Sequence, residues 1–119
     1  MAPKIEICVD NFESIREAVK GGAKRIELCS ALKEGGLTPS LGFLKFVKQQ
    51  FSKELLIVFP MIRPRGGDFN YSAEELKIMA NDIECMRENG YADGFVFGCL
   101  QSDGTVDLEA NRFLLGNFE

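Results

Sequence analysis

Residues 5–29, IEICVDNFESIREAVKGGAKRIELC, contain two short apolar segments separated by an amphipathic one. Residues 5–9 alternate apolar and polar side chains, as a half-buried strand does, and residues 25–29 repeat this alternation. Between them, residues 11–20 place apolar side chains at helical spacing and run into Gly21-Gly22, where a helix is expected to end. The stretch therefore predicts a strand, a helix and a second strand.

The same unit recurs along the rest of the chain. A glycine-containing loop at 34–40 precedes a predicted helix at about 41–51, and a third strand is expected at 55–59, continuing to residue 63. Residues 94–98 form the predicted fourth strand. Because strands that alternate with helices imply right-handed crossovers and parallel pairing, the fold class is α/β.

The helix before the fourth strand has the clearest signals. Ser72-Ala-Glu-Glu75 is a capping box, in which the serine oxygen accepts a backbone N–H while Glu75 reaches back to the start of the helix. The following apolar residues are spaced by three and four, so they share one face before Asn89-Gly90 ends the helix: Leu76, Met79, Ile83 and Met86.

The polarity of the strands distinguishes between the two common parallel α/β architectures. Strands of an open doubly wound sheet are covered on both faces and are continuously apolar. Here the first strand places Glu6 and Cys8 opposite its isoleucines, and the second places Arg25, Glu27 and Cys29 opposite Ile26 and Leu28. An apolar outer face and a polar inner face favour a (β/α) TIM-type barrel, of which four units would form the first half. We therefore expect residues 1–119 to be a single partial domain.

Composition restricts both the chemistry and the partners. The chain has 119 residues, 14 basic and 18 acidic side chains and no histidine, which excludes a Ser/His/Asp triad and any metal site that uses histidine. A net charge of −4 without a basic cluster argues against nucleic acid as a partner. The amino terminus has no apolar stretch of signal-peptide or membrane-span length, so we expect a cytoplasmic protein with no membrane association and with reduced cysteines.

Five segments of the chain resemble the CutC copper homeostasis family in order and spacing: Glu6–Asp10, Gly21–Cys29, Gly35–Ser40, Met61–Ser72 and Asp93–Asp107. The resemblance extends over residues 5–108. It implies a cytosolic, often oligomeric TIM-type barrel of about twice this length and a link to copper handling. In that family a fourth helix and four further strands follow Leu108, so the chain is interpreted as an amino-terminal half.

Two cysteines are the candidate metal ligands. Cys8 and Cys29 fall at comparable positions of neighbouring strands, on the same face, and strands lie about 4.8 Å apart. Because thiolates select Cu(I), we expect a two-sulfur Cu(I) site, assisted by Met61 on the third strand. The alternative is that both are small buried hydrophobic residues, as most free cysteines are; core or incidental roles are expected for Cys85 and Cys99.

The charged residues near the strand ends suggest a second function. Arg63 and Arg65 could bind a small anion, since the guanidinium group suits carboxylate or phosphate, and this would make the protein an enzyme acting on an anionic metabolite. Glu27 would then be the general base and Asp68 its acid or ligand partner. The structural alternative is a buried Glu27–Arg63 ion pair.

Strand edges suggest a third possibility. The first and fourth strands of a half-barrel would be unpaired edges, which are templates for pairing with another chain. We therefore expect a homo-oligomer formed through these edges, even if the half-barrel has no activity of its own.

Overall fold

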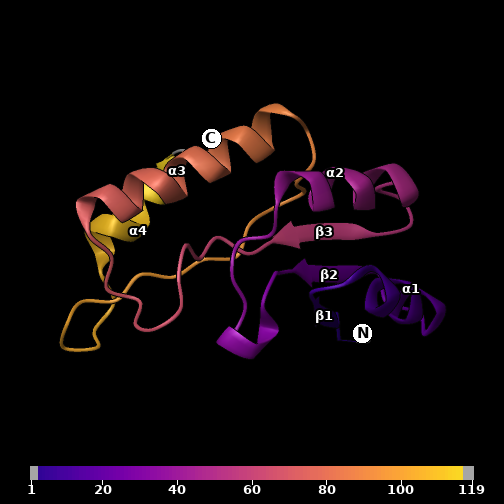
Figure 1. Cartoon of the computed structure of the whole chain (residues 1–119), viewed down its shortest axis with the longest axis horizontal. Coiled ribbons are helices and arrows are strands. Elements are labelled where there is room, and N and C mark those ends of the chain that lie inside the picture. Colours follow the sequence, from indigo (N-terminus) through magenta and orange to yellow (C-terminus); the bar gives the residue numbers. More distant parts are fainter. Residues whose placement is uncertain (1–2, 117–119) are drawn as a thin grey trace.

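The computed structural model describes residues 3–116, so the first two and the last three residues of the expected domain lie outside the described range. Strands and helices alternate along most of the chain, as predicted. In chain order the elements are β1 (Glu6–Val9), α1 (Phe12–Lys20), β2 (Arg25–Leu28), the 3₁₀ turn η1 (Leu32–Glu34), α2 (Leu41–Gln50), β3 (Ile57–Pro60), α3 (Ala73–Glu88) and α4 (Leu108–Gly116). Figure 1 shows their arrangement.

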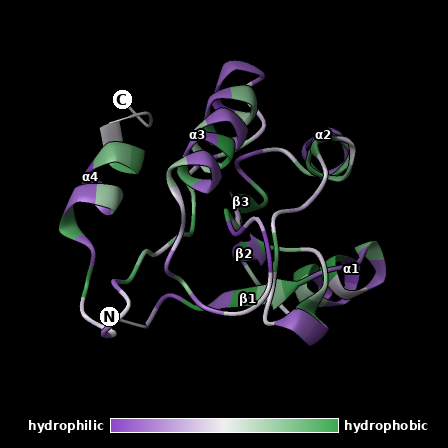
Figure 2. Ribbon diagram, turned by 60° about the vertical axis from the view of Figure 1, so that its left-hand side comes forward, coloured by the Kyte–Doolittle hydropathy of each residue, from purple (hydrophilic) through white to green (hydrophobic). Residues whose placement is uncertain are grey.

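The three strands form a parallel sheet in the order β1-β2-β3. The register pairs Cys8 with Glu27, and Glu27 with Phe59, so these side chains share one face of the sheet. The other face is apolar and packs in the core with residues of α1 and α2, which lie on one side of the sheet in Figure 2. The core residues that this face contributes are buried: Val9, Ile26, Leu28 and Val58. The predicted α/β class, parallel pairing and two-faced strands are confirmed.

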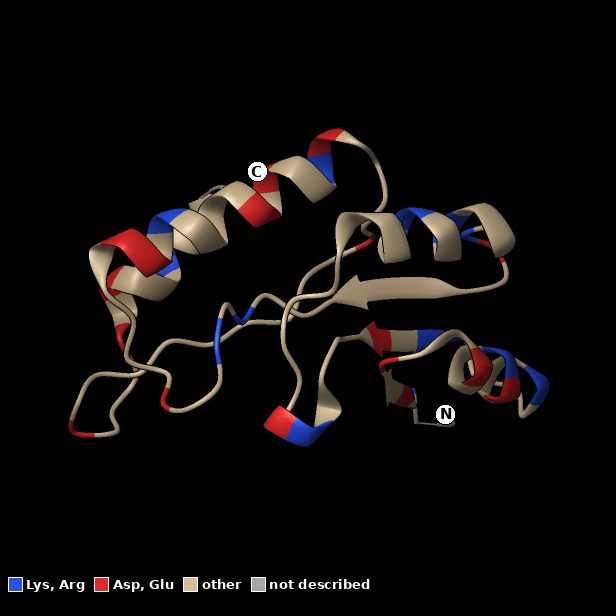
Figure 3. Ribbon diagram, viewed as in Figure 1, with Lys and Arg blue, Asp and Glu red and all other residues tan. Residues whose placement is uncertain are grey.

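We call the face that carries Cys8 and Glu27 the open face of the sheet. The charged side chains of the three strands lie only on this face. Glu6 and Arg25 form an ion pair of 2.8 Å across β1 and β2, and the Arg25 guanidinium lies over the ring of Phe59 on β3. β3 itself carries no charge, as Figure 3 shows. The polarity of the open face therefore comes from the first two strands.

The helices agree with the sequence prediction to within a residue at most ends. At the start of α3 the capping box is complete, because Glu75 N donates to Ser72 Oγ (3.1 Å) and Ser72 N donates to Glu75 Oε1 (2.8 Å). The predicted core residues Met79, Ile83 and Met86 are buried. Within residues 3–116, none of the helices combines the length and the apolar character needed to cross a bilayer.

The predicted fourth strand at 94–98 is not a regular strand, and β3 ends at Pro60 rather than at residue 63. The segment does run beside β3, because Asp93 N donates to Val58 O (3.0 Å) and Val96 N donates to Pro60 O (3.0 Å). These donors are three residues apart whereas their acceptors are two apart, so one extra residue interrupts the ladder, as in a bulge. Only a single parallel bridge, between Met61 and Val96, remains.

Candidate metal-binding site

Cys8, Glu27 and Cys29 lie together near the carboxyl ends of β1 and β2. The parallel register places Cys8 beside Glu27, and Cys29 follows β2 by one residue on the same face. The Sγ of Cys8 donates to Glu27 Oε2 at 3.3 Å, and the Sγ of Cys29 lies 3.8 Å from Glu27 Oε1. One carboxylate therefore contacts both thiols, and the sequence prediction that the two cysteines are neighbours on one face is consistent with this geometry.

The surroundings of the two thiols favour their protonated form. Desolvation raises the pKa of Cys8 to about 11, and the hydrogen bond to Glu27 and the charge of its carboxylate add to this effect. Burial, followed by the charge of Glu27, raises the pKa of Cys29 to about 12. A soft metal ion at this site would have to displace both protons.

The two thiols differ in access to solvent. Cys8 is exposed, whereas Cys29 is only 1% exposed. Met61 is level with Cys29 on the neighbouring chain segment, since Met61 N donates to Leu28 O at 2.9 Å. The role of Met61 in assisting a Cu(I) site stays a prediction. Within residues 3–116, no three acidic, cysteine or histidine side chains are grouped so that all could hold one metal ion. The candidate site thus consists of two sulfur donors.

The expected Glu27–Arg63 ion pair is wrong. Arg63 donates instead to backbone carbonyls, from Nη1 to Glu34 (2.6 Å) and Gly36 (3.2 Å) and from Nη2 to Gly67 (3.0 Å). Its position beyond β3 brings its guanidinium between two loops rather than over the sheet, and Glu27 contacts the thiols.

The second candidate anion ligand, Arg65, lies among acceptors of its own. It pairs with Glu75 and donates to the side chain of Asp68 (3.2 Å) and to its carbonyl (2.9 Å). The Arg65 hydrogen bond lowers the pKa of Glu75. Asp68 is an exposed loop residue that also accepts from Asn70 N, so its side chain interacts within its own loop rather than with Glu27.

The other two cysteines are separate from the candidate site. Cys99 is buried in the core cluster, and Cys85 is exposed on α3. Sequence reasoning missed one feature next to the site and one elsewhere in the fold. Residues 30–37 lie over Cys29, and the sequence signal for this loop was Gly35-Gly36. Elsewhere, Asp93 forms a nearly buried ion pair with Lys48 (2.8 Å), for which the sequence holds no local signal.

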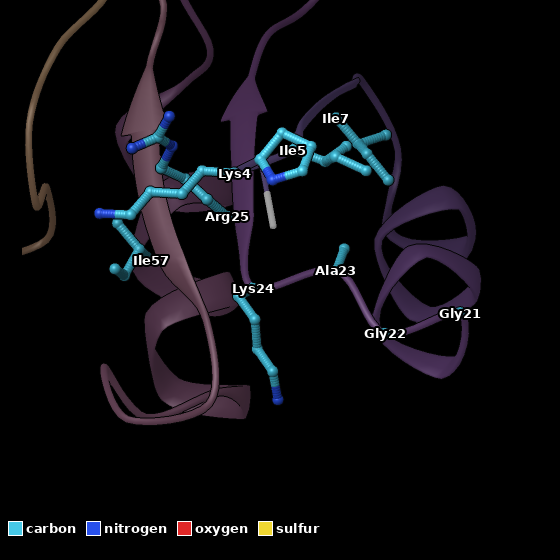
Figure 4. Close-up of a pocket in the computed structure, with 10 residues that line it drawn as sticks. Lys4, Ile5, Ile7, Gly21, Gly22, Ala23, Lys24, Arg25 and Ile57 are labelled. Carbon is cyan, nitrogen blue, oxygen red and sulfur yellow. The ribbon is translucent and has the colours of Figure 1, made fainter. Parts of the chain in front are cut away.

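A hollow of about 450 Å³ lies at the opposite, amino end of the strands. Its walls include Ile5, Ile7, Ala23 and Ile57, and Figure 4 shows the Lys24 side chain extending away from Ala23. Functional sites of parallel α/β folds lie at the carboxyl ends of the strands. The hollow is therefore not part of the candidate site.

Comparison with known proteins identifies relatives over nearly the whole chain. The CutC family profile matches residues 3–117. A copper homeostasis protein cutC homolog from Homo sapiens is 54% identical over 105 residues, which cover 88% of this chain and 37% of that protein. The homolog of the same name from Drosophila melanogaster is 50% identical over 113 residues, covering 94% of this chain and 41% of that protein.

A solved structure has the same fold. The crystal structure of a CutC copper homeostasis protein from Streptococcus agalactiae matches with a TM-score of 0.86 and 39% identity. The match covers 95% of this chain and 53% of that chain. This chain therefore spans about two fifths to one half of the length of these relatives.

Proposed function

Since the chain belongs to the CutC family, we propose that it acts in copper homeostasis by binding Cu(I) through the thiols of Cys8 and Cys29. The observation that carries the proposal is the contact of both sulfurs with the single carboxylate of Glu27. Thiolates are the soft ligands that Cu(I) prefers. Because both thiols must lose their protons, Cu(I) affinity is expected to rise with pH.

A competition titration tests this proposal. The reduced chain is titrated anaerobically with Cu(I) in the presence of a chromophoric Cu(I) chelator, and the affinity is compared with that of the Cys8→Ser/Cys29→Ser variant. We expect one ion per chain for the parent and loss of the site in the double variant.

The remaining two cysteines provide a matched control. The Cys85→Ser/Cys99→Ala variant also loses two sulfurs but is expected to keep the parent affinity. If the Cys8/Cys29 variant kept that affinity, or if both double variants lost it equally, the assignment of the site would be wrong.

The proposal includes the larger architecture. The sheet and its helices would be the first βα units of a TIM-type barrel, with the open, polar face turned toward the barrel interior; the apolar face toward α1 and α2 supports this arrangement. Four free cysteines suit a reducing compartment, which supports a cytoplasmic location.

Self-association is a further part of the proposal. The outer edge of β1 has no strand partner among residues 3–116, and such edges pair readily. We expect homo-oligomers in sedimentation velocity at micromolar concentration. A stable, monodisperse monomer would contradict this expectation.

A second candidate function is an enzyme acting on a small anionic metabolite. One observation favours it: Arg63 is 7% exposed, and its Nε has no hydrogen-bond partner in the described part of the chain. Arg63 and Arg65 would bind the anion, with Asp68 as a further ligand beside Arg65, and Glu27 would be the general base. If so, phosphate or citrate should raise the thermal midpoint of the parent and of Cys8→Ser/Cys29→Ser but not of Arg63→Ala, and no shift in the parent would dismiss this candidate.

A further inference from the structure

Cys29 is covered by the chain segment that follows it. On the same face of the sheet Cys8 is exposed and Glu27 is partly exposed, yet Cys29 is 1% exposed. A Cβ placed on Gly36 would lie 3.2 Å from the Cys29 Sγ, so the backbone of Gly36 packs directly on the sulfur. We call residues 30–37 the cover segment; in Figure 1 it is the stretch between β2 and α2 that contains η1.

The cover segment closes on itself. Ser30 and Leu37 pair as an antiparallel bridge with N–H to O distances of 2.9 and 2.8 Å, and Ala31 O accepts from Gly36 N at 3.2 Å. Gly36 has a φ of +98°, a backbone conformation in which a residue with a side chain would be strained. Because Gly36 has no Cβ, its backbone can approach Cys29 closely. The segment is therefore a compact loop with a defined inner surface.

Arg63 holds this loop from the side of β3. Its Nη1 donates to the carbonyls of Glu34 (2.6 Å) and Gly36 (3.2 Å), and its backbone exchanges hydrogen bonds with Thr38, from Arg63 N to Thr38 Oγ1 (2.8 Å) and from Thr38 N to Arg63 O (3.0 Å). The Arg63 guanidinium also lies over the ring of Phe69. Because Arg63 is almost fully buried, these carbonyls replace water around its charge, and opening the loop would leave that charge without them.

A second attachment ties the loop to β1. Leu32 N donates to Asp10 Oδ2 at 3.0 Å, and Asp10 follows β1 directly. The cover segment is thus held at the ends of both strands that flank β2, with Cys29 beneath it.

From these contacts we infer that Arg63 is a positioning residue: it holds the cover segment over the Cys29 thiol, so that Cys29 becomes accessible only when this segment opens. In the Cu(I) site proposed above, Cys8 is then the sulfur that meets the ion first, and Cys29 joins after the cover segment moves. The role of this opening in Cu(I) binding rests on the proposed function, whereas the control of access to Cys29 does not.

Site-resolved alkylation tests the inference without copper. The reduced full chain and its Arg63→Met variant are treated with iodoacetamide at one pH, and the alkylation rate of each cysteine is measured by peptide mass spectrometry. Methionine keeps an apolar stem but removes the forked donors. Arg65→Met, which removes the neighbouring forked donors from Glu75 and the 66–70 loop, is the matched control.

Loss of the guanidinium donors in Arg63→Met should accelerate alkylation of Cys29 by about tenfold or more, while the alkylation rate of Cys8 stays within about twofold of the parent rate. Cys99, which is 2% exposed in the core, reports global unfolding and should not change. Arg63→Lys should give an intermediate Cys29 rate, because lysine keeps the charge but lacks the fork. An unchanged Cys29 rate in Arg63→Met, or equal acceleration of Cys29 and Cys99 in both Arg63 variants, would overturn the inference.

A copper measurement separates this inference from the proposed function. A chelator should remove Cu(I) from Arg63→Met about tenfold faster than from the parent, because the cover segment no longer closes over the sulfur. If the parent binds no Cu(I), the proposed function fails, and the alkylation rates still decide whether Arg63 controls access to Cys29. Equal removal rates from parent and variant would refute a role of the cover segment in holding the ion.

Discussion

Replacement of Asp93 by alanine should destabilise the protein strongly, because Asp93 joins three parts of the molecule. Its Oδ2 accepts from Lys48 Nζ on α2 (2.8 Å) and from Val58 N on β3 (2.9 Å), and it begins the segment that runs beside β3. The Asp93 and Lys48 side chains are 9% and 12% exposed. Asp93→Ala leaves a nearly buried ammonium group and a backbone N–H without their acceptor. Breaking such a pair from one side costs about 3–5 kcal/mol of unfolding free energy.

Urea unfolding followed by circular dichroism measures this loss. With a slope of about 2 kcal/mol/M, the midpoint should fall by about 1.5–2.5 M. Asp93→Asn keeps an oxygen for Val58 N and should lose less, and Lys48→Met/Asp93→Ala should recover part of the stability because no charge is left unpaired. A loss below about 1 kcal/mol for Asp93→Ala would refute the reasoning that this ion pair is desolvated.

Two further predictions follow from close contacts and from the thiols. Gly94→Ala would place a Cβ 2.6 Å from Phe59 Cε1, so the unfolding free energy should fall by about 1–3 kcal/mol. Gly98→Ala is the control, because a Cβ at Gly98 has nothing within 4 Å and should leave the unfolding free energy nearly unchanged. Equal urea midpoints for the two variants would contradict this prediction. Because the pKa values of Cys8 and Cys29 are raised from 9.0 to about 11 and about 12, the folded chain retains protons that the unfolded chain loses above pH 9. Stability should therefore decline as the pH rises from 9 toward 11, and Cys8→Ser/Cys29→Ser should reduce that decline when unfolding is measured across this range.

The regular elements were predictable because local sequence signals and tertiary structure agree. Alternation in residues 5–9 and 25–29 gave two strands with their faces assigned correctly, and Ser72 with Glu75 gave the start of α3. The segment at 94–98 has the composition of a strand, but the extra residue in its pairing with β3 depends on a partner that the sequence does not identify.

The candidate site was predictable only in part, for a related reason. Parallel pairing of β1 and β2 was enough to bring Cys8 and Cys29 to one face, with Glu27 between them. The partners of Arg63 could not be predicted from the sequence. Its charge suggested an acidic side chain as partner, whereas in the structure its guanidinium donates to backbone carbonyls. Backbone acceptors have no sequence signature, so a buried arginine of this kind is recognised only once the loops around it are placed.

A thermal melt of the reduced chain, followed by circular dichroism with and without one equivalent of Cu(I), tests the central claim most directly. A ligand that binds the folded state raises the midpoint, whereas one that prefers unfolded thiols lowers it. We predict a cooperative transition that Cu(I) shifts upward in the parent and leaves unshifted in Cys8→Ser/Cys29→Ser. A midpoint that Cu(I) leaves unchanged or lowers in the parent, or raises equally in the double variant, would contradict Cu(I) binding by these two thiols.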